Sequence, residues 1–276
     1  MTDRRVLSVS VALLLLVLLS LLTWPVWRWL WGEWWTNAYY SHGILILPVS
    51  AYLAWRRWRG GTWQGENRGL ALTAFGEGLF LFFVANKTYY LAAFAMIVAL
   101  AGLVWTFGGL RLLRQLAFPL LFLGLMIPLP ITERATLPLA LWTGDCSDWL
   151  VHRLGLDVTI VGTSVTLPNA NLVIGAQCSG IQSLISLLSV TVLFAYAVRG
   201  PGWGRLALVV AAIPLAMLSN VLRVSSLIGV ARYLGTDAAF SFYHDYSGPL
   251  FFLAALLLMV PLARLFQCKM LRFEVL

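Results

Sequence analysis

Long apolar runs with few charges are the feature that most restricts what this chain can fold into. Hydrophobic residues make up 61% of the 276 residues and charged residues only 11%, whereas a water-soluble domain carries about 25% charged residues. A transmembrane helix needs about 20 predominantly apolar residues, and the chain holds several such runs. The sequence therefore predicts an integral membrane protein.

Eight apolar stretches are long enough to predict an all-α polytopic membrane protein. The predicted spans cover residues 6–31, 40–56, 69–86, 89–108, 111–130, 178–198, 205–228 and 247–266. The first begins like a signal peptide, but its apolar run continues without a small-residue cleavage site, so we expect it to be retained.

Basic residues cluster in alternate loops between these spans. Cytoplasmic loops of membrane proteins carry an excess of Lys and Arg. If the N-terminus is cytoplasmic, the basic loops after the second, fourth and sixth spans and the C-terminal tail all fall on that same side. This agreement predicts a multi-pass protein with both termini in the cytoplasm, and it accounts for the net charge of +8 without a nucleic-acid partner.

Residues 131–177 form the one long segment between the predicted spans, and they lie on the outer side in this topology. Their first part, ITERATLPLALWTGDCSDWLVHRLGL, predicts an amphipathic helix on the outer surface. Their second part, DVTIVGTSVTLPNANLVIG, predicts short β-strands joined by turns. We expect a single domain over 1–276 that contains this segment as an outer-face insertion.

Cys178 stands where the stretch GAQCSGIQSLISLL enters the sixth predicted span. The unpaired N–H groups and the positive dipole end of a helix N-terminus lower the pKa of a thiol toward the reactive thiolate. Ser179 and Gly180 keep that first turn narrow, so a substrate backbone could approach. The alternative is that Cys178 packs as a small hydrophobic residue, as buried free cysteines commonly do.

Arg223 lies inside the otherwise apolar seventh span, near its outer end. A charge at such a place costs a few kcal/mol unless it finds a partner or water, so it marks a candidate functional site. Asn220 and Ser219 share a helical face with Arg223 and could orient its guanidinium. The alternative is an arginine that extends to the nearby lipid headgroups.

His244 precedes the eighth span and returns to the same outer side. Histidine titrates near neutral pH and can move protons to and from a reacting group. Cysteine with histidine is an activated-nucleophile pair of acyl transfer, and an arginine can stabilise the oxyanion. We therefore predict that Cys178, Arg223 and His244 lie within hydrogen-bonding reach, or one water, of each other. Together they would support the attack of Cys178 on a carbonyl at the outer membrane interface.

Two further histidines and an acidic residue within a span leave alternatives open. His152 or His42 could replace His244 as the base, and His42 could instead contact substrate or pack the second span. The carboxylates near His152 lack the spacing of metal ligands, so we expect no metal. Glu77 is costly in lipid and is expected to face a polar interior, where it pairs with a basic residue or meets substrate.

The sequence contains two further cysteines, Cys146 and Cys268. Cys146 lies on the predicted outer side and could form a disulfide with Cys178 in an oxidising compartment, which would block the nucleophile. Cys268 lies in the cytoplasmic tail, and we assign it no role.

Three short motifs resemble the signature positions of the exosortases and archaeosortases. They are Cys-Ser-Gly-Ile at 178–181, Asn-x-x-Arg at 220–223 and His-x-x-x-Gly at 244–248. The early Tyr-Ser-His-Gly at 40–43, followed by Pro48 and Trp55, is similar to the N-terminal region of that family. The resemblance covers essentially the whole chain.

This resemblance implies a membrane-embedded cysteine protease or transpeptidase of the bacterial inner membrane, without a cofactor. Its substrates would be exported proteins that end in a Pro-Glu-Pro motif, one transmembrane helix and a basic tail, cleaved through a thioester. The family's proposed catalytic residues map onto Cys178, Arg223 and His244. The supporting or substrate-binding positions are Ser179, Gly180, Asn220, His42 and Gly248.

Two other classes of protein share some of these features. A transporter also carries charged residues and glycine breaks within its spans, but the halves of the chain show no internal repeat. The other alternative is a non-catalytic subunit of an exopolysaccharide export system, for which Cys178 would be dispensable.

Overall fold

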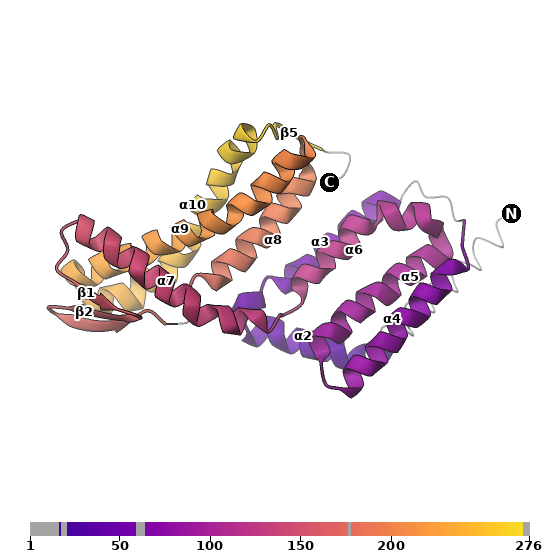
Figure 1. The fold of residues 1–276 in the computed structure, drawn as a ribbon, viewed down its shortest axis with the longest axis horizontal. Helices are drawn as coiled ribbons and strands as arrows, with labels where there is room; N and C mark the ends of the chain where they lie inside the picture. The colour runs from indigo at the N-terminus through magenta and orange to yellow at the C-terminus, as the bar shows by residue number, and fades with distance from the viewer. Residues whose placement is uncertain (1–16, 18–20, 59–63, 176–177, 273–276) are drawn as a thin grey trace. The chain divides into compact units, whose positions relative to one another are not determined.

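The computed structural model describes residues 17, 21–58, 64–175 and 178–272 (Figure 1). It leaves out the side chains of residues 170, 240–242, 244 and 270. The chain is mostly helical and divides into two compact units, Met1–Leu129 with Glu274–Leu276, and Pro130–Phe273.

The first unit is built around a long helical hairpin. Its elements are α2 (Trp24–Thr36), η1 (Ala38–Tyr40), α3 (Gly43–Trp58), α4 (Arg68–Ala85), α5 (Tyr89–Gln115), α6 (Ala117–Phe122) and η2 (Leu123–Met126). Helices α4 and α5 form the hairpin and lie side by side (Figure 1). The indole N–H of Trp34 in α2 donates to the carbonyl of Met126 at 2.9 Å, which ties η2 to α2.

Glycines let the backbones of α4 and α5 touch. A Cβ added at Gly76 would lie 2.5 Å from the backbone nitrogen of Ala99, and one added at Gly102 would lie 2.4 Å from that of Thr73. In lipid, helices associate through such close packing rather than through the hydrophobic effect, and small residues permit it. The hairpin is therefore stabilised by backbone contact that a larger side chain would prevent.

The substitution Gly76→Leu is expected to lower the thermal unfolding midpoint of the detergent-solubilised protein. Forcing a side chain into a packed contact costs about 1–3 kcal/mol, and here the contact is with backbone, which cannot rotate away. Gly78→Leu is the matched control, because a Cβ at Gly78 would meet nothing within 4 Å. The midpoints are measured by tryptophan fluorescence. Equal midpoints for the two variants would contradict the close packing.

In its described residues, the second unit contains four α-helices, one short π-helix and two small sheets. Its elements are α7 (Ile131–Arg153), β1 (Thr159–Val161), β2 (Ser164–Leu167), β3 (Ala170–Val173), α8 (Ile181–Ala197), β4 (Val198–Arg199), α9 (Gly202–Leu234), η4 (Ala238–Tyr243), α10 (His244–Leu265) and β5 (Met270–Leu271). Strands β1, β2 and β3 form an antiparallel sheet in that order, with Val165 of β2 opposite Leu172 of β3. These strands occupy the second part of the 131–177 segment, and α7 occupies its first part.

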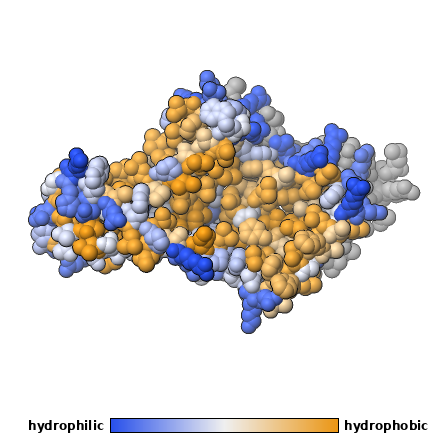
Figure 2. Space-filling view, viewed as in Figure 1, coloured by the Kyte–Doolittle hydropathy of each residue, from blue (hydrophilic) through white to orange (hydrophobic). Residues whose placement is uncertain are grey.

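Helices α8, α9 and α10 run between two polar ends of this unit (Figures 1 and 2). At one end, β4 pairs antiparallel with β5, and the Lys269 N–H donates to the Arg199 carbonyl at 3.2 Å. At the other end, the side chain of Asn169 in the turn between β2 and β3 donates to the Ala231 carbonyl of α9 at 3.0 Å. Apolar side chains cover the visible face of the helices between these ends (Figure 2).

Among the described residues, four helices are long and apolar enough to cross a membrane: α4, α5, α9 and α10. The count is five if Ala117–Met126 and Ile131–Arg153 form one broken span, and α8 is a shorter apolar helix of 17 residues. The chain is thus a polytopic, mostly helical membrane protein, but the predicted count of eight spans is not confirmed.

The unconfirmed spans differ from the matching ones in length and continuity. Most of the predicted span 6–31 lies outside the described residues. The predicted span 40–56 yields α3, a helix of 16 residues with Pro48 inside it. The predicted span 111–130 covers the end of α5, the six-residue α6 and the 3-10 turn η2. These segments are shorter or more interrupted than the four long apolar helices, so the spans predicted there stay unconfirmed.

Candidate active site

Cys178 lies in the turn between β3 and α8, outside the helix itself. It is 7% exposed and packs in an apolar cluster with Ile174, Val224 and Ile228. Its backbone carbonyl accepts a hydrogen bond from the side-chain amide of Asn220 in α9, at 2.8 Å. The backbone at Cys178 is therefore held to the middle part of the neighbouring helix α9 by a specific hydrogen bond.

Asn220 links three segments of the chain at this point. Its Nδ2 donates to the Cys178 carbonyl and lies 3.2 Å from the Thr143 hydroxyl of α7. Gly180 has a φ of 80°, and a Cβ added there would lie 2.7 Å from Cγ of Asn220. Only glycine suits both the left-handed backbone and this contact. The side of Gly180 on which a side chain would stand is thus filled by Asn220, while the approach of a substrate backbone to this turn stays a prediction.

Ser179 contributes less to the turn than its neighbours do. Its side chain is buried, and the Ile181 N–H lies 3.5 Å from its hydroxyl oxygen, which is the weak limit of hydrogen bonding.

Arg223 extends from α9 to α10. Its Nε donates to the hydroxyl of Ser247 at 3.2 Å, and a Cβ added at Gly248 would lie 3.7 Å from its Cζ. The guanidinium therefore lies against the glycine of the His-x-x-x-Gly motif. The sequence did not single out Ser247, although its position directly before Gly248 in that motif was a usable signal.

The two neighbours expected to orient Arg223 are bonded elsewhere. The side-chain amide of Asn220 donates to the Cys178 carbonyl, as described, and the hydroxyl of Ser219 donates to the Phe251 carbonyl of α10 at 2.8 Å. Helical spacing placed both residues near Arg223, but the closest donors and acceptors are on other segments. The guanidinium is bonded to Ser247, and an orienting role for Asn220 and Ser219 stays a prediction.

The pKa of the Cys178 thiol is raised, which reverses the direction that the sequence predicted. Burial is the largest cause, since the thiolate loses its hydration, while the positive charge of Arg223 and a backbone hydrogen bond at Gly175 act in the lowering direction. A cysteine that serves packing alone does not require a cation at its side. The nearness of Arg223 is thus the observation that favours chemistry at Cys178 over packing.

Cys178 is expected to react with iodoacetamide only at a higher pH than an ordinary cysteine. The thiolate is the reactive form, and a raised pKa means that the thiolate fraction grows later as the pH rises. The measurement is the pH of half-maximal alkylation of the Cys178 peptide, determined by mass spectrometry on the full chain in detergent. A midpoint below that of a model thiol would show that Arg223 outweighs burial.

His244 is the first residue of α10, one helical turn before Gly248. Its side chain lies outside the described residues, so its approach to Cys178 stays a prediction. The residues on both sides of it are placed, because the hydroxyl of Tyr243 donates to Ser226 of α9 and Ser247 accepts from Arg223. The start of α10 is therefore held against the part of α9 that carries Arg223.

The other histidines have local settings of their own. His152, in the last turn of α7, lies 2.8 Å from the carbonyl and 3.3 Å from the carboxylate of Asp148. His42 belongs to the first unit, directly before α3, and burial lowers its pKa. The role of either histidine as the base stays a prediction.

The other two cysteines, Cys146 and Cys268, and the acidic groups add little to the site. Cys146, Cys178 and Cys268 are free thiols. Glu77 lies in α4, and its Oε2 is buried with no hydrogen-bond partner among the described residues. Within the described ranges, no group of three or more His, Cys, Asp and Glu side chains could hold a metal ion.

An apolar groove of about 550 Å³ runs beside the site, between α7 and α9. Each helix contributes residues at positions i, i+3, i+4, i+7 and i+8, starting at Trp142 in α7 and at Pro214 in α9. Thr143 and Asn220, which meet near Cys178, adjoin these two stripes in sequence. The α7–α9 pair therefore carries both the Asn220–Thr143 contact and an apolar groove.

Together, fold and site define a polytopic membrane protein with a buried cysteine beside an arginine on a neighbouring helix. The family model for transmembrane exosortases (Exosortase_EpsH) matches residues 34–261, most of the chain. The chain belongs to this family. No curated protein and no solved structure matches it.

Proposed function

We propose that the chain is a membrane-embedded cysteine protease or transpeptidase that cleaves C-terminal Pro-Glu-Pro sorting signals of exported proteins. Membership of the exosortase family suggests a sorting transpeptidase role. The observation that carries the proposal is the placement of Arg223, whose charge acts on the Cys178 thiol and whose Nε is bonded to Ser247. Acyl transfer from a peptide bond uses a thiol as the nucleophile and a nearby cation to stabilise the oxyanion.

The reaction proceeds in two steps. The Cys178 thiolate attacks the carbonyl carbon of the scissile peptide, and the guanidinium of Arg223 compensates the charge on the tetrahedral oxyanion. His244 gives a proton to the departing amine as the C–N bond breaks, leaving a thioester on Cys178. Water or a second amine then attacks the thioester, which returns the thiol and releases a cleaved or a transferred product.

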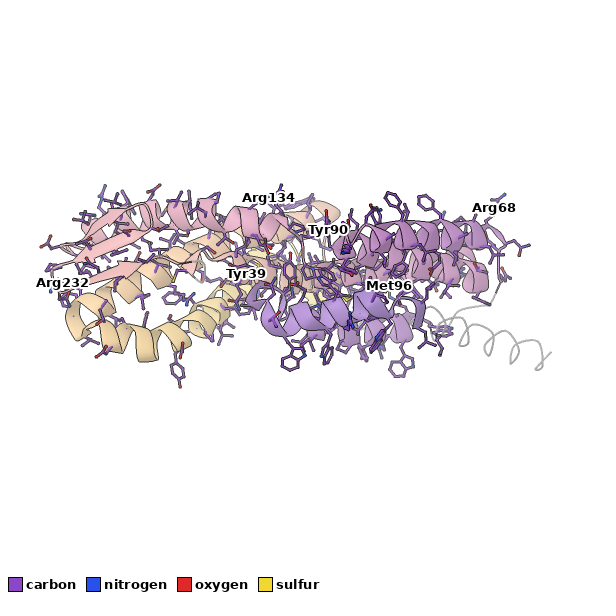
Figure 3. All side chains as sticks on the ribbon, turned by 90° about the horizontal axis from the view of Figure 1, so that it is seen from below. Tyr39, Arg68, Tyr90, Met96, Arg134 and Arg232 are labelled. Atoms are coloured by element: carbon purple, nitrogen blue, oxygen red, sulfur yellow. The ribbon has the colours of Figure 1, made fainter. Side chains whose placement is uncertain are left out.

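The length of α9 supports a site at the outer face of the inner membrane. At about 1.5 Å per residue, the helix between Arg205 and Arg223 is about 27 Å long, close to the roughly 30 Å of the hydrocarbon core. Basic residues gather at the Arg205 end, where β4 and β5 join Arg199 to Lys269, as cytoplasmic segments do. In this proposal Arg223 lies at the outer boundary, and α9 continues past it to Leu234. Arg232, in the last turn of α9, lies at the end of the second unit (Figure 3).

The test is a reporter protein that ends in a Pro-Glu-Pro motif, an apolar helix and an Arg-rich tail, expressed with the chain. We expect loss of the tail on a gel only when the chain is present. A reporter with Lys in place of the motif's Glu is the matched control and should stay intact. An intact reporter in both cases would contradict the proposed substrate class, and a transporter or a non-catalytic subunit would give that result.

A further inference from the structure

The segment that begins α10 is fastened to α9 on both sides of His244. Before it, the hydroxyl of Tyr243 donates to Ser226 at 2.7 Å, and Ser226 donates to the backbone carbonyl of Arg223 at 2.8 Å. After it, Ser247 accepts the bond from Nε of Arg223. One attachment thus ends on the backbone of Arg223 and the other on its side chain, so the two can be separated by mutation.

We propose that Ser247 is a positioning residue, which sets the plane and the place of the Arg223 guanidinium beside Cys178. Its role in the reaction rests on the proposed function, while its role in holding the arginine does not. Ser247 is 2% exposed, so water does not compete well for the bond. None of the signature motifs assigns Ser247 a role.

The chemistry of arginine explains why one hydroxyl has this effect. The side chain has several rotatable bonds, and fixing it costs conformational entropy. Nε belongs to the planar guanidinium, so a bond there orients the whole group. Gly248 lies near the same group, since a Cβ added there would come within 3.7 Å of its Cζ. The bond from Nε to Ser247 thus orients the positive charge.

Loss of the Ser247 hydroxyl leaves α10 attached to α9. The Tyr243–Ser226 pair still holds the start of α10, and the Ser219 hydroxyl still donates to Phe251 farther along it. Ser219 also supplies the matched control. Its bond joins the same two helices one turn away, but it ends on a backbone carbonyl and does not contact the guanidinium.

The experiment compares Ser247→Ala, Ser247→Thr and Ser219→Ala in the full chain. Two quantities are measured: reporter processing, and the pH of half-maximal Cys178 alkylation. Ser247→Ala is expected to lower processing about tenfold, the usual effect of losing a hydrogen bond to a charged group. It should also move the alkylation midpoint to higher pH, because the cation is no longer held near the thiol. Ser247→Thr should restore both, and Ser219→Ala should change neither.

An alkylation profile of Ser247→Ala that coincides with that of the unaltered chain would overturn the proposal. An equal shift in Ser219→Ala would also overturn it, because the hydroxyl would then act only through helix packing. If the unaltered chain cleaves no reporter while Ser247→Ala alone shifts the midpoint, the positioning role stands and the proposed function fails. The two inferences can therefore fail separately.

Discussion

Replacing Cys178 by alanine is expected to abolish reporter processing, with a loss of at least about a thousandfold in rate. Cys268 is not expected to take its place, since it packs in a different apolar cluster from Cys178. Cys178→Ser should retain at most a trace, because a hydroxyl at this position is far less ionised than a thiol. The measurement is the rate of tail release at equal protein levels.

The matched control for this variant is Cys268→Ala. Cys268 is also a buried free cysteine, but it lies beside Gly200 at the end of the second unit where β4 and β5 pair. Its replacement removes a thiol of similar burial without touching the candidate site, and processing should stay close to that of the unaltered chain. If Cys178→Ala processes the reporter at a rate within a few-fold of normal, Cys178 is not the nucleophile.

Replacing Arg223 by alanine is expected to lower processing about a hundredfold, as loss of an oxyanion-stabilising group does. The same variant should raise the pH of half-maximal Cys178 alkylation, because the charge of Arg223 acts to lower the pKa of that thiol. Arg223→Lys keeps the charge but lacks the Nε donor that Ser247 accepts, so we expect an intermediate result in both measurements.

This prediction fails if Arg223→Ala leaves both the processing rate and the alkylation profile unchanged. Such a result would favour the alternative in which the side chain reaches only the lipid headgroups. Thermal unfolding of each variant guards against a simple loss of folding, since Ser247 and Gly248 lose a neighbour when the guanidinium is removed.

The sequence predicted the continuous helices well because length and apolar content decide them. The predicted spans 69–86, 89–108, 205–228 and 247–266 match α4, α5, α9 and α10, although α5 and α9 run well past the predicted ends. Hydropathy does not report how far a helix continues past its apolar run, so the extension of α9 from residue 228 to Leu234 could not be read from it. It also does not report breaks such as those between α5, α6 and η2.

The candidate site was predictable in its residues but less so in its contacts. Cys178 and Arg223 stood out because their chemistry is unusual at an apolar boundary. The bond between Arg223 and Ser247 depends on the register of α9 against α10, which no periodicity in one helix reveals. The predicted direction of the Cys178 pKa shift was wrong because the turn carries the thiol into the apolar cluster around Val224 and Ile228, where burial exceeds the lowering effects of Arg223 and of the backbone hydrogen bond at Gly175.

The most direct test of Cys178 as the nucleophile is to trap the acyl-enzyme. Hydroxylamine cleaves thioesters, so adding it during processing should yield a reporter whose new C-terminus is a hydroxamate, detected by mass spectrometry, at the expense of the other products. We expect this hydroxamate with the unaltered chain and its loss in Cys178→Ala. Cleavage that continues without any hydroxamate, or a hydroxamate that still forms without Cys178, would contradict a thioester at this residue.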